Sequence, residues 1–162
     1  MRIGVDAMGG DLAPAEPVKG ALAARKFLGE GDEVVLIGDE PCVRSYLDST
    51  PDWREFIRVE HAPEVVGMSD VPVETLRQKP NSSIARMAEL ASRGEVNAVI
   101  SAGNTGACVA ACQMRLRRLR GVIDVTLLRT WGCGVWPGQP GLAIASGCPA
   151  AFAEGCGADR TR

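Results

Sequence analysis

The sequence has few aromatic residues, one histidine and no excess of positive charge. Aromatic residues make up 4% of the 162 residues, and the formal net charge is −2. This charge offers no electrostatic attraction to nucleic acid, so we predict no nucleic-acid partner. No apolar run approaches the length that crosses a bilayer, and residues 1–6 lead into a strand pattern rather than into the apolar segment of a signal peptide. We therefore expect a cytoplasmic protein with at most peripheral membrane association.

Several motifs of metal and cofactor sites are also missing. None of the six cysteines has the Cys-x-x-Cys spacing of zinc or redox sites. Cys108 and Cys112 lie four residues apart with no histidine beside them, so we predict that they are small buried hydrophobic residues and that the chain binds no metal. The Gly-x-Gly-x-x-Gly fingerprint of dinucleotide sites, with its ribose-binding acidic residue, is absent as well. We therefore predict no cofactor.

Strand patterns and helix patterns alternate over residues 1–120. With 46% hydrophobic residues, a chain of this length supports one domain with a substantial core. Repeated βα units predict an α/β fold, a mostly parallel sheet with helices on both faces. The expected strands are 2–6, 33–37, 57–60 and 96–100, and the expected helices are 15–28, 41–47, 72–78, one from the cap candidates 81–83 to Gly94, and 105–119.

Two glycine-rich segments follow predicted strands and precede predicted helices. They are Val5-Asp6-Ala7-Met8-Gly9-Gly10-Asp11 and Ser101-Ala102-Gly103-Asn104-Thr105-Gly106-Ala107. The carboxyl ends of strands are where an open α/β sheet exposes its loops to ligands. Glycine lets backbone N–H groups approach an anion, and a helix N-terminus adds favourable partial charge. The two segments therefore predict recognition of a phosphate or an oxyanion.

Each polar residue of these segments has a structural alternative. Asn104 and Thr105 are suited to donate to phosphate or to an acyl oxyanion, but either could simply cap the following helix. Asp6 and Asp11 could orient a substrate or accept a proton; alternatively, Asp11 caps the first helix and Asp6 braces the loop.

Three other features carry weaker predictions. Of Ser82 and Ser83, one is expected to cap a helix, which leaves the other to donate to phosphate at the same terminus. His61 is expected to have a surface or hydrogen-bonded structural role rather than to act as a base. An arginine cluster at a helix end suits the helix dipole and solvent, with docking of an acidic carrier protein as the alternative; it consists of Arg115, Arg117, Arg118 and Arg120.

The motifs together resemble the bacterial phosphate acyltransferases of the PlsX family. The first segment followed by Ala13-Pro14 is similar to the opening signature of that family. The second segment, Leu36-Ile37-Gly38-Asp39, His61-Ala62 and the serine pair follow in the family's order and at similar spacing, so the resemblance covers residues 1 to about 122. It implies a truncated form of a three-layer α/β/α fold related to isocitrate and isopropylmalate dehydrogenases.

The resemblance also implies an enzyme of lipid biosynthesis. Such an acyltransferase moves a fatty acyl group from acyl carrier protein to inorganic phosphate, and the acyl phosphate feeds phospholipid synthesis; the family forms homodimers. The alternatives are a non-catalytic phosphate- or acyl-binding module and a dehydrogenase-like relative of the same fold. We predict Asp6 and Asn104 as catalytic, and as substrate- or phosphate-binding residues Met8, Gly9, Gly10, Asp11, Ser82, Ser83, Ser101, Gly103, Thr105 and Gly106.

The composition changes near Gly121. Residues 121–162 hold 8 of the 19 glycines but only 6 charged residues, and Pro137, Pro140 and Pro149 disfavour regular elements. We therefore divide the chain into an N-terminal part of an acyltransferase domain, 1–122, and an irregular tail, 123–162. A shifted reading frame or an early stop would account for the tail, with a genuine lineage-specific tail as the alternative, and the chain alone is expected to be an inactive fragment.

Overall fold

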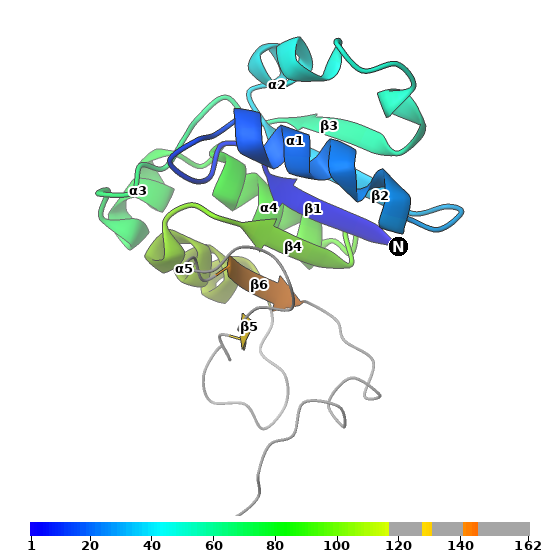
Figure 1. The fold of residues 1–162 in the computed structure, drawn as a ribbon. Helices are drawn as coiled ribbons and strands as arrows, with labels where there is room; N and C mark the ends of the chain where they lie inside the picture. Colours follow the sequence, from blue (N-terminus) through cyan, green and yellow to red (C-terminus); the bar gives the residue numbers. More distant parts are fainter. Residues whose placement is uncertain (117–127, 131–140, 146–162) are drawn as a thin grey trace, which may run out of the picture.

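The computed structural model describes residues 1–116, 128–130 and 141–145. Its centre is a parallel sheet of β1 (Arg2–Asp6), β2 (Glu33–Gly38), β3 (Ile57–His61) and β4 (Ala98–Ser101), in the order β3-β2-β1-β4. Helices lie on both faces of this sheet (Figure 1). The fold class predicted from the sequence, a three-layer α/β/α arrangement, is therefore confirmed.

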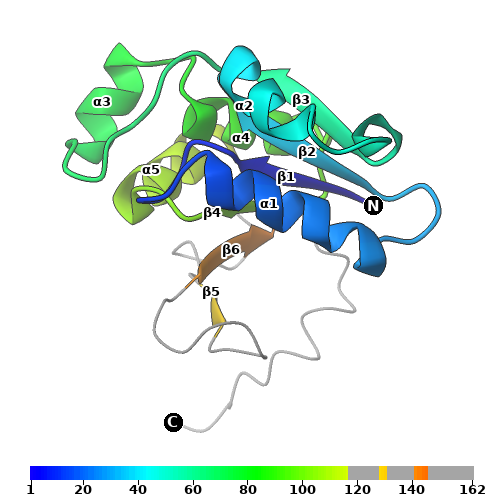
Figure 2. The ribbon, with the colours of Figure 1, turned by 45° about the horizontal axis from the view of Figure 1, so that its top comes forward.

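The helices divide between the two faces of the sheet. Helices α1 (Ala15–Ala23) and α2 (Glu40–Leu47) cover one face, and α4 (Ser83–Ser92) and α5 (Thr105–Arg115) cover the other (Figure 2). Helix α3 (Pro72–Gln78) lies beside α5 at the end of the molecule where β1 and β4 finish. Two short 3-10 helices, η1 (Ala24–Phe27) and η2 (Trp53–Glu55), complete the described helical elements.

Strand β2 shows why both faces must be covered. Val34 and Leu36 pack with α1 and α2, whereas Val35 and Ile37 pack with α4 and α5. Successive side chains of a strand point to opposite faces, so a continuous apolar run needs a helix layer on each side. All four side chains are at most 3% exposed. The apolar run of residues 34–37 is therefore a buried central strand, as its sequence predicts.

Two helices are shorter than their sequence patterns suggest. Helix α1 ends at Ala23 and continues as the 3-10 turn η1 rather than as a regular helix to Leu28. Helix α5 ends at Arg115, because Leu116 adopts extended backbone angles. The helix expected to reach residue 119 therefore stops earlier, and residues 117–119 lie outside the described part.

Two segments of the tail extend the sheet. Strand β6 (Gly141–Ala145) pairs antiparallel with β4, and β5 (Leu128–Thr130) pairs antiparallel with β6. The structure thus differs at these segments from the irregular backbone expected over 123–162. The reason is local: residues 142–145 form a short apolar run, and the prolines at 137, 140 and 149 lie outside it. The domain boundary near residue 122 and the origin of the tail stay predictions.

None of the helices in the described ranges has both the length and the apolar character needed to cross a membrane.

Candidate functional site

The two glycine-rich loops meet at the carboxyl edge of the sheet. They follow the adjacent strands β1 and β4, and a methyl group on Gly103 would lie 3.2 Å from Cα of Gly9. A methyl group on Gly9 would lie 2.8 Å from the backbone nitrogen of Gly103 and 2.6 Å from Oδ2 of Asp6. These distances leave no space for a side chain, so the close approach depends on glycine. The two loops therefore lie side by side, whereas their binding of phosphate stays a prediction.

Asp6 joins the two loops by hydrogen bonds. Its side chain is 2% exposed. Oδ1 accepts from the backbone N–H of Met8 at 3.0 Å, and Oδ2 accepts from the hydroxyl of Ser101 at 2.7 Å. The same hydroxyl oxygen accepts from the backbone N–H of Gly103 at 3.1 Å. The alternative role proposed for Asp6, bracing the loop, is therefore confirmed.

Burial raises the pKa of the Asp6 carboxyl above its ordinary value. Hydrogen bonds from the hydroxyls of Ser83 and Ser101 and from the backbone of Met8 and Gly9 lower this pKa, but burial has the larger effect. The charged carboxylate is disfavoured because it has lost water, and the donors around it replace only part of that solvation. Asp6 therefore retains a proton to higher pH than an exposed aspartate does.

Asn104 uses all of its side-chain groups within the protein. It is the N-cap of α5, where Oδ1 accepts from the backbone N–H of Ala107 at 3.0 Å. Nδ2 donates to the carbonyl oxygens of Gly67, Met68 and Asp70 at 3.1, 3.3 and 3.1 Å. An amide has two hydrogens, so an oxyanion would have to displace one of these carbonyls. The helix-cap interpretation is confirmed, and a direct catalytic role stays a prediction.

Neither serine of the pair caps α4 with its side chain. Ser82 occupies the N-cap position, but its buried hydroxyl has no hydrogen-bond partner among the described residues. Ser83, the first residue of α4, is buried, and its hydroxyl lies near enough to the Asp6 carboxyl to lower the pKa of that group. The expected side-chain cap by a serine is therefore not formed.

The other residues predicted for the site lie around these loops. Gly10 has φ +104°, a conformation that favours glycine, and Met8 packs so closely on Gly38 that a methyl group there would lie 2.9 Å from its Cγ. Asp11 is exposed and does not cap α1, whose N-cap position is taken by Pro14. Thr105 and Gly106 are exposed in the first turn of α5, and a methyl group on Gly106 would lie 2.7 Å from Cγ of Pro72.

The remaining candidates have structural roles. His61 is exposed, and its Nδ1 accepts from the backbone N–H of Glu40 at 3.2 Å, as the hydrogen-bonded interpretation predicts. Cys108 and Cys112 are buried on α5, and burial raises the pKa of each thiol to about 11. Their burial confirms the packing role that the sequence predicted. Arg115 is exposed in the last turn of α5, and Arg117, Arg118 and Arg120 lie outside the described residues.

The segment 64–81, which precedes the serine pair and includes α3, was not predicted to contact the site. Its ends are joined by a bridge between Glu64 and Ser82. Oδ2 of Asp70 accepts from the backbone N–H of Gly67 at 3.0 Å and from Nζ of Lys79 at 3.1 Å, and these two donors lower the pKa of Asp70. The Gly-x-x-Asp spacing is a turn signal in the sequence, but nothing local indicates that the turn docks on Asn104.

Comparison with known proteins places the chain in one family. Residues 1–135 match the family described as fatty acid synthesis protein. A phosphate acyltransferase of Desulforudis audaxviator is 46% identical over 122 residues, which are 75% of this chain and 35% of the relative. Phosphate acyltransferases of Pelotomaculum thermopropionicum and Synechococcus elongatus are 39% and 42% identical over 144 and 147 residues, or 89% and 90% of this chain and 40% and 41% of the relatives.

The chain thus spans between 35% and 41% of the length of these relatives. The match over residues 1–135 covers β1 to β4, and with them both glycine-rich loops that meet at Gly9 and Gly103. This chain therefore belongs to the family of fatty acid synthesis proteins, and the relatives it resembles are named phosphate acyltransferase.

Proposed function

We propose that the protein to which this chain corresponds transfers a fatty acyl group from acyl carrier protein to inorganic phosphate, giving acyl phosphate for phospholipid synthesis. The observation that carries this proposal is the contact between Gly9 and Gly103 at the carboxyl edge of the sheet, in a chain whose relatives are named phosphate acyltransferase. The chain spans at most 41% of the length of these three relatives. We therefore propose that it supplies the phosphate-binding part and that turnover requires further residues.

In this proposal the chain positions phosphate rather than activating it. Inorganic phosphate is anionic at neutral pH and is itself the nucleophile that attacks the thioester carbonyl. The first-turn N–H groups of α5 at Thr105 and Gly106 would hold it, because the N-terminus of a helix favours an anion. The bond between Asp6 and Ser101 would keep the loop of Gly9 and Gly10 at a fixed distance from that turn. Attack forms a tetrahedral oxyanion, which collapses and expels the carrier thiolate.

Phosphate binding can be measured on the chain by ³¹P NMR titration. We expect Thr105→Val to weaken binding several-fold, because it removes one exposed hydroxyl and keeps the shape of the side chain. Ser49→Ala, an exposed hydroxyl after the end of α2, is the matched control and should bind as the unchanged chain does. The proposed site would be contradicted if the unchanged chain did not bind phosphate. It would also be contradicted if the unchanged chain, Thr105→Val and Ser49→Ala bound phosphate equally well.

Acyl transfer is tested separately by trapping acyl phosphate with hydroxylamine. We expect the purified chain to release none from acyl carrier protein thioester, and a longer homologue to release it in proportion to phosphate. Phosphate binding without release by the longer homologue would favour the non-catalytic binding module. Turnover by the chain at a homologue's rate would show that the chain alone suffices for catalysis. The carrier protein, the homodimer and the cytoplasmic location stay predictions.

A further inference from the structure

The segment between β3 and α4 leaves the sheet and returns to nearly the same place. Glu64 precedes it and Ser82 follows it, and these two residues form a parallel bridge. The backbone carbonyl of Glu64 accepts from the N–H of Ser83 at 3.1 Å, and its carboxylate accepts from the N–H of Asn81 at 2.8 Å. Residues 65–81, the strap, are therefore a loop whose two ends are fastened together.

Lys79 holds the two halves of the strap together. Its Nζ donates to the carbonyl of Val65 at 2.8 Å and to Oδ2 of Asp70 at 3.1 Å. The same carboxylate oxygen accepts from the backbone N–H of Gly67, so one ammonium group fixes the start of the strap and the turn at its far end. Helix α3 has seven residues, which are too few for a helix to be stable alone. Loss of the Lys79 contacts should therefore loosen the whole strap rather than one end of it.

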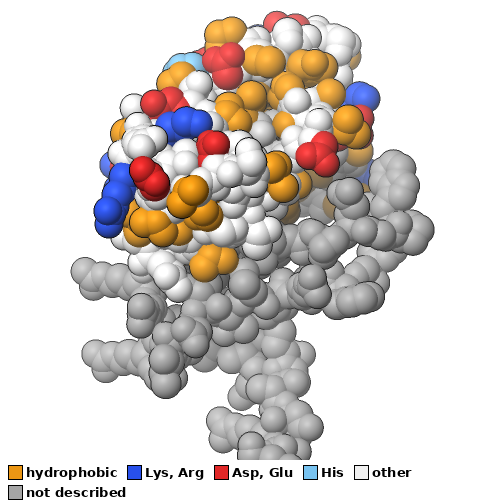
Figure 3. Space-filling view, turned by 90° about the vertical axis from the view of Figure 1, so that its left-hand side faces the viewer, with side chains coloured by type: hydrophobic (Ala, Val, Ile, Leu, Met, Phe, Trp, Pro, Cys, Tyr) orange, Lys and Arg blue, Asp and Glu red, His pale blue; other side chains and the backbone are white. Residues whose placement is uncertain are grey.

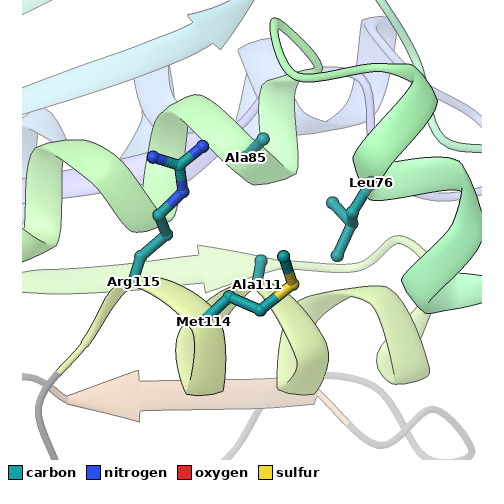
Figure 4. A pocket seen from close by; sticks show the side chains of 5 residues that line it. All are labelled: Leu76, Ala85, Ala111, Met114 and Arg115. Atoms are coloured by element: carbon teal, nitrogen blue, oxygen red, sulfur yellow. The ribbon is translucent and has the colours of Figure 1, made fainter.

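The apolar contacts of the strap with α4 and α5 are limited. Val66 and Leu76 are buried in the core beneath it, but a cleft lined by Leu76 and Met114 remains between α3, α4 and α5 (Figure 4). Met68 and Val71 are 59% and 62% exposed, and Figure 3 shows this end of the molecule, where hydrophobic side chains lie among charged ones. Segments that bury little apolar surface are the ones that open without unfolding the rest of a protein.

The side-chain amide of Asn104 attaches the strap to the start of α5. Its Nδ2 donates to the carbonyl oxygens of Gly67, Met68 and Asp70, which are three acceptors for two hydrogens. At least one of these carbonyls therefore shares a hydrogen, and the attachment is weaker than three full hydrogen bonds. Because both hydrogens point at the strap, the amide has none left for a ligand.

We propose that the strap is a latch, closed by Lys79, which keeps the Asn104 amide occupied and releases it when the strap opens as one unit. Lys79 is then a positioning residue, because it acts on Asn104 through the strap. Opening leaves the amide free beside the first turn of α5, at Thr105 and Gly106. The use of the freed amide for an oxyanion rests on the proposed function, whereas the opening does not. The alternative is a permanently closed strap that only supports α5.

Hydrogen exchange of the whole chain, followed by NMR, tests the latch. The reporters are the backbone amides of Gly67, Asp70 and Thr75, which are hydrogen bonded within the strap, and the side-chain NH₂ of Asn104. Lys79→Met keeps an unbranched side chain and removes the ammonium group. We expect all four reporters to exchange about tenfold faster in this variant and by the same factor, because one opening exposes them together.

Lys19→Met is the matched control. Lys19 lies on α1 and pairs with Glu16 at 2.9 Å, so this substitution also removes an ammonium group from an ion pair, but on the other face of the sheet. The four reporters should exchange as they do in the unchanged chain. If Lys79→Met does not fold, Asp70→Asn is measured in its place on the other three reporters, because it removes the charge that Lys79 contacts and keeps the side-chain size.

Three results would overturn the latch. The first is exchange of the reporters no faster than that of the β2 amides in the unchanged chain, since the strap would then open only with global unfolding. The second is faster exchange of the backbone reporters without faster exchange of the Asn104 NH₂. The third is an equal acceleration in Lys19→Met. None of these measurements uses phosphate, so failure of the phosphate titration would leave the latch standing, and failure of the latch would leave the phosphate site standing.

Discussion

At the scale of single residues, Asp6 determines how the site is assembled. Its carboxyl group accepts hydrogen bonds from its own loop, at Met8, and from Ser101 on the neighbouring loop. One buried group therefore joins two loops that are distant in the sequence. Such a group costs stability in its charged form, and the surrounding donors offset only part of that cost.

The stability of the chain should depend on pH through Asp6. Burial raises the pKa of Asp6 in the folded state, so the folded state binds its proton more tightly than the unfolded state does. The stability that this proton gives is fully present below the unfolded pKa and is lost as pH rises through the folded pKa. We expect the free energy of unfolding of Asp6→Asn, relative to the unchanged chain, to rise as the pH increases from 4 to 7.

Urea unfolding at several pH values measures this difference. Asp11→Asn is the control, because it removes the same charge from the same loop at an exposed position. A difference that falls as pH rises would mean that the donors around Asp6, rather than its burial, govern its protonation.

The sequence predicted the position of these residues better than their contacts. The strand-to-helix spacing placed Gly9 and Gly103 at one edge of the sheet, because adjacent parallel strands end on the same side. It did not predict that Ser83 would lie near Asp6, since that proximity depends on how α4 packs on the sheet. A local sequence pattern also does not show whether Asn104 caps the helix or donates to an oxyanion, because both roles would use the same side-chain amide.

At the scale of elements, the start of α5 couples a helix to a loop. Asn104 caps α5 with its oxygen and holds residues 67–70 with its nitrogen, so its two ends serve two elements. The sequence predicted α3 over 72–78, and the structure gives the same bounds. The sequence did not predict which distant residues this segment contacts, because a turn signal indicates only the local backbone conformation.

Two substitutions of Asn104 should separate these functions. Asn104→Ala removes both, and we expect it to cost roughly 1–3 kcal/mol of stability. Asn104→Asp keeps the accepting oxygen of the cap and loses the donor to the loop. Hydrogen exchange should therefore quicken at residues 67–71 in both variants, but in the first turn of α5 only in Asn104→Ala.

The same alanine substitution in a full-length homologue tests catalysis. We expect turnover to fall by on the order of a hundredfold, more than stability alone explains, if an oxyanion uses this amide during reaction. An unchanged rate with a lower melting temperature would restrict Asn104 to its cap and loop contacts.

At the scale of the whole molecule, the sheet contains strands from two parts of the sequence. One part has clear strand and helix periodicity, and the other, the tail, has little. Residues 1–116 carry the strand and helix periodicity that makes their fold predictable from sequence. After residue 121 charged residues are scarce and glycine is frequent, so neither the two-residue period of a strand nor the 3.6-residue period of a helix can be recognised. Strand β6 nevertheless pairs with β4 along four residues, because its apolar run, although too short to show a period, lies along the edge of β4.

The pairing of β6 with β4 should contribute to the stability of the whole chain. Ile144 stands opposite Val99, and β6 lies between β4 and β5 in the sheet. Ile144→Pro removes an N–H group and fixes φ inside that strand, so we expect a loss of more than about 1 kcal/mol in urea unfolding. Ile144→Val keeps the N–H and suits a strand, and it should change stability far less.

Because an uncovered edge of β4 is open to pairing with another chain, Ile144→Pro should also increase association in sedimentation velocity as concentration rises. If the two variants match in stability and association, β6 does not protect that edge.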